Sequence, residues 1–129
     1  MTSRLEIYRR IALVQTPEDR SDIVDELIDR FGEPPAGLVN LIDVSMLRNT
    51  AARLGIPEIS QKRGALFFTV TKPNPKQLSA LMRRYFDRIS FNDRTQPYFV
   101  AVRLVKGELA VDLMRQVLGI FAENASEAD

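Results

Sequence analysis

The spacing of apolar residues changes near Gly55, and this change restricts the folds open to the chain. Before Gly55, apolar residues recur at intervals of three and four, the period of an amphipathic helix. After it, short runs rich in Phe, Val and Thr alternate with turn residues, a pattern typical of strands. A helical block followed by strands and further helices is characteristic of an α+β protein.

Helices are predicted over residues 3–14, 16–31 and 34–54. Ser3 and Glu6 have the spacing of a capping box, and Thr16 before a proline is a strong signal for a helix start. The second helix carries the clearest apolar stripe, formed by Ile23, Val24, Leu27, Ile28 and Phe31. Gly32 follows this helix and suits the positive φ that often ends one.

The second half is predicted to contain strands and helices at residues 56–61, 65–71, 74–87, 89–91, 98–105 and 108–122. The first two strands are joined by a tight turn at Lys62-Arg63-Gly64. Phe67 and Phe68 point to opposite faces of their strand, so at least one of them packs in a core. We expect three helices and then a mixed sheet of about four strands packed with two helices. These elements should form one domain over residues 1–122, followed by a disordered acidic tail at 123–129.

Cysteine and histidine are both absent from the chain. Their absence excludes a disulfide, a Cys/His zinc site, a Ser-His-Asp triad and a histidine general base. No glycine-rich segment has the spacing of a phosphate-binding loop, so ATP hydrolysis is not expected. We therefore expect a non-catalytic domain without metal or cofactor. A hydrolase that holds a metal ion with carboxylates is the enzymatic alternative, and magnesium-dependent activity would reveal it.

No apolar run is long enough to span a membrane, and the first residues lack a signal peptide. Without cysteine or an export signal, the cytoplasm is the expected compartment. The 18 basic and 17 acidic side chains give a net charge of +1, so no global field attracts nucleic acid or an anionic membrane. The charge is unevenly distributed, with −1 over residues 1–64, +5 over 65–122 and −3 over 123–129.

Six carboxylates crowd the second predicted helix, at Glu18, Asp19, Asp22, Asp25, Glu26 and Asp29. Asp29 is expected in the last turn, where the helix dipole disfavours negative charge. Glu26, Asp29 and Arg30 are spaced to share one ridge, on which Glu26 can pair with Arg30. This ridge is either a solvated face or a polar docking surface for a protein, with Asp22 and Asp25 as further candidates. A catalytic carboxylate pair is disfavoured because a wet ridge does not push two pKa values apart.

Five arginines gather in the second half with two aromatic residues between them, at Arg83, Arg84, Tyr85, Phe86, Arg88, Arg94 and Arg103. Basic and aromatic side chains together can bind phosphates and stack on bases. A nucleic-acid-binding module is therefore the alternative function. Tyr85, however, continues the core stripe of its helix, so its burial is expected. On that interpretation the arginines form an ordinary solvated surface.

Three segments are similar to a known family. Glu26-Leu27-Ile28-Asp29-Arg30-Phe31-Gly32, followed by Pro35, resembles the signature of the C-terminal domain of bacterial transcription-repair coupling factors (Mfd). The segments 4–12 and 48–56 are similar to further parts of the same domain. The motifs are strong over residues 4–56, whereas residues 57–129 are similar only in their pattern of elements.

The resemblance implies one domain of a large, ATP-driven DNA translocase that dislodges stalled RNA polymerase and recruits excision repair. The motor, which uses ATP and Mg²⁺, and the contacts to RNA polymerase and DNA lie in other domains of such a protein. In this family the C-terminal domain is a regulatory clamp on the UvrB-like N-terminal module, where it covers the surface that UvrA would bind. Glu26, Asp29 and Arg30 then supply the polar contacts to that module. The basic second half is not part of the motif.

Overall fold

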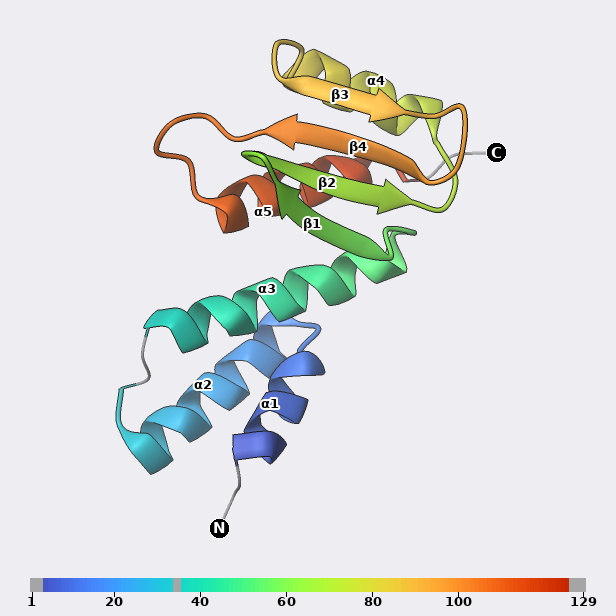
Figure 1. Ribbon diagram of the computed structural model, residues 1–129. Helices are drawn as coiled ribbons and strands as arrows, with labels where there is room; N and C mark the ends of the chain where they lie inside the picture. The colour runs from blue at the N-terminus through green and yellow to red at the C-terminus, as the bar shows by residue number, and fades with distance from the viewer. Residues whose placement is uncertain (1–3, 34–35, 126–129) are drawn as a thin grey trace. The chain divides into compact units, whose positions relative to one another are not determined.

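The computed structural model describes residues 4–33 and 36–125 (Figure 1). Within these ranges the chain forms five helices and four strands. In chain order they are α1 (Arg4–Ala12), α2 (Pro17–Phe31), α3 (Ala36–Arg53), β1 (Glu58–Lys62), β2 (Ala65–Val70), α4 (Pro75–Arg84), β3 (Ile89–Asn92), β4 (Tyr98–Arg103) and α5 (Ala110–Glu123). The predicted α+β class and the predicted order of elements are confirmed.

The chain divides into two compact units, residues 1–50 and 51–129, with the boundary near the end of α3. The N-terminal unit has six basic and nine acidic side chains, a net charge of −3, and the C-terminal unit has twelve and eight, a net charge of +4. The uneven charge along the sequence therefore follows the division into units. A single domain over 1–122 stays a prediction. Of the predicted tail, residue 123 completes α5, and residues 126–129 lie outside the described ranges.

In the N-terminal unit, local capping starts α2 where the sequence predicts. The Thr16 hydroxyl accepts a hydrogen bond from the Asp19 amide, and the Asp19 carboxylate accepts one from the Thr16 amide. The predicted cap at Thr16 is thus a complete capping box. The other predicted box pairs Glu6 with Ser3, which lies outside the described ranges. The core of this unit is apolar and consists of Ile11, Val14, Ile23, Leu27 and Ile42.

Polar contacts tie α3 to the other two helices of this unit. Asn49 of α3 donates its side-chain amide to the carbonyl oxygens of Ala12 and Val14, at 2.9 and 2.8 Å. These bonds satisfy carbonyl groups at the end of α1 that have no partner within their own helix. Arg20 of α2 donates to Asp43 of α3 at 2.5 Å, and this hydrogen bond raises the pKa of Arg20.

The four strands of the C-terminal unit form one sheet in the order β1-β2-β4-β3. Every neighbouring pair is antiparallel, so the expectation of a mixed sheet is wrong in this respect. β2 and β3, which α4 connects, do run in the same direction. They are not neighbours, because β4 inserts between them and pairs with both. A parallel ladder needs two such strands side by side.

A two-residue turn at Arg63-Gly64 closes the β1–β2 hairpin. Both residues have a positive φ, 51° and 76°, as a type I′ turn requires. Lys62 pairs with Ala65 directly across the turn. The predicted tight turn is therefore confirmed, and it sets the register in which Phe68 lies opposite Ile59.

α4 and α5 lie on the same side of the sheet (Figure 1). Tyr85 and Phe68 are buried, and the ring centroids of Phe68 and Phe121 are 6.2 Å apart. The predicted burial of Tyr85 is confirmed. Gln77 is a buried polar residue, and its side-chain amide donates to the Phe121 carbonyl at 2.9 Å. Other buried apolar residues of this unit are Leu66, Leu81, Val100, Val102, Leu113, Val117 and Leu118.

Candidate protein-docking surface

Glu26 lies at the centre of the predicted ridge and joins two arginines. Its carboxylate accepts a hydrogen bond from Arg10 of α1, and it pairs with Arg30 of α2 at 3.2 Å between Oε2 and Nη2. The predicted pair of Glu26 with Arg30 is confirmed. Hydrogen bonding from Arg10 holds the pKa of Glu26 below its ordinary value. Glu26 therefore stays ionised and directs both guanidinium groups.

Arg10 is the member of this cluster that the sequence reasoning missed. It precedes Glu26 by 16 residues and lies on another helix, so no local spacing rule links the two side chains. The side chains of Arg10 and Arg30 are 45% and 47% exposed. Part of each guanidinium therefore faces solvent and can reach an acidic group on a partner.

Asp29, unlike Glu26, has no partner among the residues that the structure describes. It is exposed in the last turn of α2 and makes no hydrogen bond or ion pair within the described part of the chain. The negative end of the helix dipole disfavours a carboxylate at such a position by roughly 0.3–1 kcal/mol. No contact within the described residues of the unit offsets this cost, so these residues give no reason for a carboxylate there.

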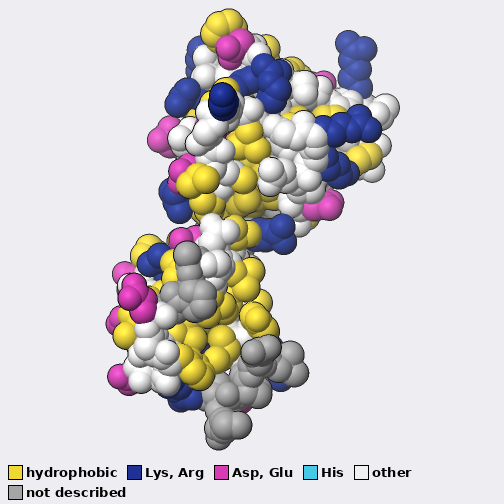
Figure 2. Space-filling view, turned by 60° about the vertical axis from the view of Figure 1, so that its left-hand side comes forward, with side chains coloured by type: hydrophobic (Ala, Val, Ile, Leu, Met, Phe, Trp, Pro, Cys, Tyr) yellow, Lys and Arg dark blue, Asp and Glu magenta, His cyan; other side chains and the backbone are white. Residues whose placement is uncertain are grey.

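Asp29 ends a row of exposed carboxylates along α2. Glu18, Asp22 and Asp25 precede it at spacings of four, three and four residues, which places all four on one side of the helix. Within residues 4–33 and 36–125 none of these four carboxylates forms an ion pair. Figure 2 shows acidic side chains along one side of the N-terminal unit. The further candidates Asp22 and Asp25 thus belong to one negative row with Asp29.

The apolar stripe of α2 divides into two parts. Ile23 and Leu27 are core residues, whereas Ile28 and Phe31 are 48% and 62% exposed. A unit of three helices has one core to fill, and the outer part of the stripe is left open. Figure 2 shows apolar side chains gathered on the surface of this unit. Ile28 and Phe31 lie on a different side of α2 from Asp29, so a protein partner meets them as well as Asp29 only where it covers both sides of the helix.

A shallow hollow of about 240 Å³ lies between α1 and α2 and shares Arg10 with the charged cluster. Its lining mixes apolar and charged side chains, namely Arg10, Leu13, Val14, Asp19, Asp22 and Ile23. Leu13 is 70% exposed at this position. The hollow can therefore receive an apolar stem with a basic end, such as a lysine or arginine side chain.

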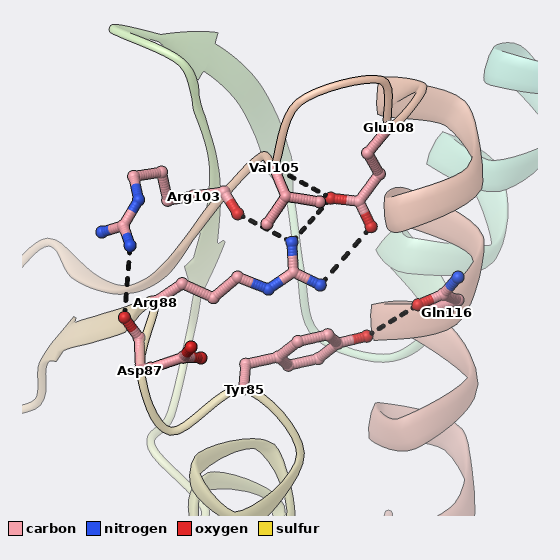
Figure 3. A network of polar contacts seen from close by, with 7 residues as sticks. All are labelled: Tyr85, Asp87, Arg88, Arg103, Val105, Glu108 and Gln116. Carbon is pink, nitrogen blue, oxygen red and sulfur yellow. Dashed lines mark hydrogen bonds and ion pairs between the residues drawn. The ribbon is translucent and has the colours of Figure 1, made fainter.

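In the C-terminal unit, the Arg88 side chain takes part in a network of hydrogen bonds and ion pairs (Figure 3). Arg88 donates to Glu108 at 2.6 Å and to the Arg103 carbonyl at 3.0 Å. Its guanidinium carbon lies 5.0 Å from the centroid of the Tyr85 ring. The side chains of Arg88 and Glu108 are only 12% and 13% exposed. Arg88 is thus paired and mostly buried, so it does not belong to the exposed basic patch that the sequence predicted.

The other four arginines of that predicted patch, Arg83, Arg84, Arg94 and Arg103, are exposed. Arg84 lies over the Tyr85 ring at 5.0 Å, and Arg103 donates to the Asp87 carbonyl at 3.2 Å. α4 ends at Arg84, three residues before its predicted end. The Arg88 amide then donates to the Tyr85 carbonyl in a turn. This turn precedes β3 and brings Arg88 to Glu108.

Acid is expected to weaken the contribution of Glu108 to stability. Hydrogen bonding by Arg88 lowers the pKa of Glu108 in the folded chain. This stabilisation is therefore present above the ordinary carboxyl pKa and is lost as the pH falls through the lowered value. The melting temperature of Glu108→Gln should lie below that of the wild type at neutral pH, and the gap should narrow below about pH 4.

The control for this measurement is Asp112→Asn, which removes an exposed carboxylate paired with Arg115. Its melting temperature should differ little from that of the wild type at any pH. A gap between wild type and Glu108→Gln that stays constant from neutral to acidic pH would contradict the expected linkage.

The carboxylates of the described segments do not assemble into a metal site. No group of three or more acidic side chains there is arranged to hold a metal ion. The acidic row of α2 spreads its carboxylates about one helical turn apart along the axis, which is too far for several of them to reach one ion.

No helix in the described ranges is both long and apolar enough to cross a membrane.

The family model of the TRCF domain matches residues 1–81. The match covers more than half of the chain and includes the ridge residues Glu26, Asp29 and Arg30. The chain belongs to the TRCF domain family. The segments 4–12, 26–32 and 48–56, which resemble this family in sequence, all lie in the matched part of the TRCF domain.

Curated relatives of this TRCF domain are transcription-repair-coupling factors. The protein of Escherichia coli (strain K12) is 30% identical over 128 residues, which is 97% of this chain and 11% of the relative. That of Bacillus subtilis (strain 168) is 25% identical over 122 residues, covering 91% of this chain and 10% of the relative. The chain therefore spans about a tenth of the length of these relatives.

A solved structure shares the fold of this TRCF domain. It is described as the crystal structure of the C-terminal domain of transcription-repair coupling factor. The match has a TM-score of 0.72 and covers 95% of this chain and 78% of the other, at 17% identity. The likeness extends past residue 81, so it includes the sheet and the last helices as well.

Proposed function

We propose that this TRCF domain is a non-catalytic regulatory clamp. It docks on the UvrB-like module of the longer protein to which it belongs and masks the surface that UvrA would bind. The observation that carries the proposal is Asp29, an exposed carboxylate without a partner among the described residues and in the least favourable turn of its helix. A basic group on the docked module would neutralise it and remove the local cost.

The charged side chains around Asp29 present a fixed pattern to the partner. Arg10 and Arg30 are both held by Glu26, so less side-chain freedom is lost when they bind. In this proposal Asp29 contacts a basic side chain of the module, and the two arginines contact acidic groups. Glu26 acts through the arginines, because its own carboxylate is already satisfied within the unit.

A clamp of this kind needs contacts that are specific but releasable. Exposed ion pairs contribute about 0–1 kcal/mol each and are screened by salt, while wrong charge pairings are strongly disfavoured. Ile28 and Phe31, which stay exposed on the same helix, supply apolar area without making the contact permanent. Closed and open states then differ by a few kcal/mol, so a competing partner can shift the balance.

The remaining activities of the longer protein are assigned to its other domains. ATP and Mg²⁺ serve the motor, and RNA polymerase and the duplex DNA on which the motor moves are bound elsewhere, since this chain spans about a tenth of its relatives. UvrA is affected indirectly, when the clamp opens. The family model match includes the ridge of α2, which supports the docking role of that ridge.

Asp29→Arg is expected to weaken docking more than about 30-fold, because it places a like charge against the basic group of the partner. The measurement is isothermal titration calorimetry of the 129-residue chain into the isolated UvrB-like module, at low and high salt. Wild-type affinity should fall as salt rises. The variant should retain its far-UV circular dichroism, because Asp29 makes no contact in the described part of the chain.

The matched control is Asp93→Arg, the same charge reversal at an exposed position of the β3–β4 loop. It should leave the affinity within about twofold of the wild type. Absence of heat at low salt, with both proteins folded, would refute the docking. Equal affinities for Asp29→Arg and the wild type would remove the ridge from the interface.

A further inference from the structure

The sheet has one face that no helix of the C-terminal unit covers. α4 and α5 both lie on the other side, behind the sheet in Figure 1. Side chains alternate between the two faces along each strand. Phe68 is buried on the helical side, so Phe67 lies on the uncovered face, and the strand register gives the other residues of that face. Within the described part of the C-terminal unit, this face of the sheet therefore has no helix packed on it.

The strand register arranges this open face in three rows across the sheet. The first row contains Lys62, Ala65 and Arg103. The second contains Ser60, Phe67, Ala101 and Ser90. The third contains Glu58, Thr69, Phe99 and Asn92. The face therefore has a basic end, then two phenyl rings among Ala, Ser and Thr side chains, and at the far end Asn92 and the carboxylate of Glu58.

Phe67 and Phe99 form an aromatic pair on the two central strands. Their ring centroids are 5.5 Å apart, and the ring planes are inclined at 55°. Both side chains are half-buried, and Ala101, which pairs with Phe67 across the strands, is buried. Buried phenylalanines such as Phe68 complete a core, whereas these two rings keep part of their surface open to a flat apolar ligand.

Positive charge gathers at one end of the face. Lys62 and Arg103 flank Ala65 in the first row, and the Lys62 ammonium lies 6.0 Å from the Phe67 ring centroid. Arg63 follows in the hairpin turn, and the Gly64 carbonyl accepts a hydrogen bond from the Leu104 amide just after β4. Lys62, Arg63 and Arg103 are all exposed. The whole unit carries a net charge of +4.

We propose that the open sheet face binds single-stranded nucleic acid. Bases would stack on Phe67 and Phe99, while the phosphates would lie along Lys62 and Arg103. Stacking on aromatic side chains beside a basic track is the usual way in which proteins hold single strands without reading sequence. A duplex hides the faces of its bases, so it cannot use the two rings. The hydroxyl groups of Ser60, Ser90 and Thr69 can bond to base edges.

This surface differs from the basic patch that the sequence predicted. Of the five arginines in that patch, Arg103 alone is in a row of the open face. Arg88 is held by Glu108, and Arg83 and Arg84 lie on α4, on the other side of the sheet. The proposal also stands apart from the docking ridge on α2, because no residue of that helix takes part.

Phe67→Leu is expected to weaken binding of a single strand at least about fivefold, because leucine keeps the apolar contacts but cannot stack on a base. The probe is a fluorescein-labelled oligothymidylate of about 12 nucleotides, titrated with the 129-residue chain and followed by fluorescence anisotropy. A duplex of equal length should bind more weakly, because its bases are not free to stack on the two rings. Lys62→Ala should make the fall of log affinity with log salt concentration less steep, by the amount expected for the loss of about one phosphate contact.

Phe86→Leu is the matched control, since Phe86 is 79% exposed and belongs to no row of the face. It should leave the affinity unchanged. Circular dichroism and the melting temperature check the fold of each variant. If Phe67→Leu is unfolded, the titration is made with Phe99→Leu instead. No binding at low salt, equal losses for Phe67→Leu and Phe86→Leu, or preference for the duplex would each overturn the proposal. The proposal would also be overturned if sedimentation showed that the free chain is a dimer and that Phe67→Leu dissociates this dimer.

Discussion

Replacing Arg88 with alanine is expected to lower the free energy of unfolding by about 3 kcal/mol. Arg88 and Glu108 pair at 2.6 Å with side chains that are 12% and 13% exposed. Removing the arginine leaves the Glu108 carboxylate mostly out of water without its counter-charge, and it also opens space beside the Tyr85 ring. The measurement is urea denaturation followed by circular dichroism and tyrosine fluorescence, since Tyr85 and Tyr98 both lie in the C-terminal unit.

Arg84→Ala is the control for this prediction. Arg84 also lies 5.0 Å from the Tyr85 ring but is exposed, so its loss should cost no more than about 0.5 kcal/mol. The double variant Arg88→Met with Glu108→Leu should recover most of the stability, because no charge is then left without a partner. Equal effects of Arg88→Ala and Arg84→Ala would show that the pair with Glu108 contributes little.

Phe68→Ala is expected to cost about 3–5 kcal/mol, the usual loss when a buried phenylalanine is truncated. Phe68 is fully buried on the helical side of β2 and lies 6.2 Å from Phe121 of α5, ring centroid to ring centroid. The cavity would separate the sheet from α5, and the two cannot close it without moving β2, which pairs with β1 and β4. Urea denaturation monitored by circular dichroism measures the loss.

Phe86→Ala removes the same ring from an exposed position. It should change the stability by less than about 0.5 kcal/mol, which separates the effect of the cavity from that of losing an aromatic group. A Phe68→Ala variant as stable as Phe86→Ala would mean that the sheet and α5 are not packed as described. Taken with the Phe67→Leu titration, this comparison tests whether the two faces of one strand serve stability and binding separately.

Much of the secondary structure follows from short-range chemistry, so it could be predicted from the sequence. Thr16 caps the start of α2 through hydrogen bonds with Asp19, three positions away. Gly32 follows the last residue of α2 and has a φ of 80°. The hairpin turn at Arg63-Gly64 depends on two residues with positive φ. Such signals act within a few residues, and tertiary contacts rarely override them when they agree with the apolar period.

The polar contacts between elements could not be predicted in this way. Arg10 and Glu26 are 16 residues apart, and Arg88 and Glu108 are 20 apart. Many arginines and carboxylates of the chain are compatible with such pairs, and only the packing of the helices and strands selects the partners. The insertion of β4 between β2 and β3, which makes the sheet fully antiparallel, also arises from packing at long range.

Three features can be read from the residues alone: the order of the elements, the position of Asp29 in the last turn of α2 and the family signature around it. Tertiary structure decided which charges are engaged: Glu26 and Arg88 have partners in the fold, while Asp29 has none in its described part. It also decided that Phe68 is covered and Phe67 is left half open. The physical reason is that helix capping and turns are local, whereas ion pairing and burial depend on which distant elements lie against a side chain.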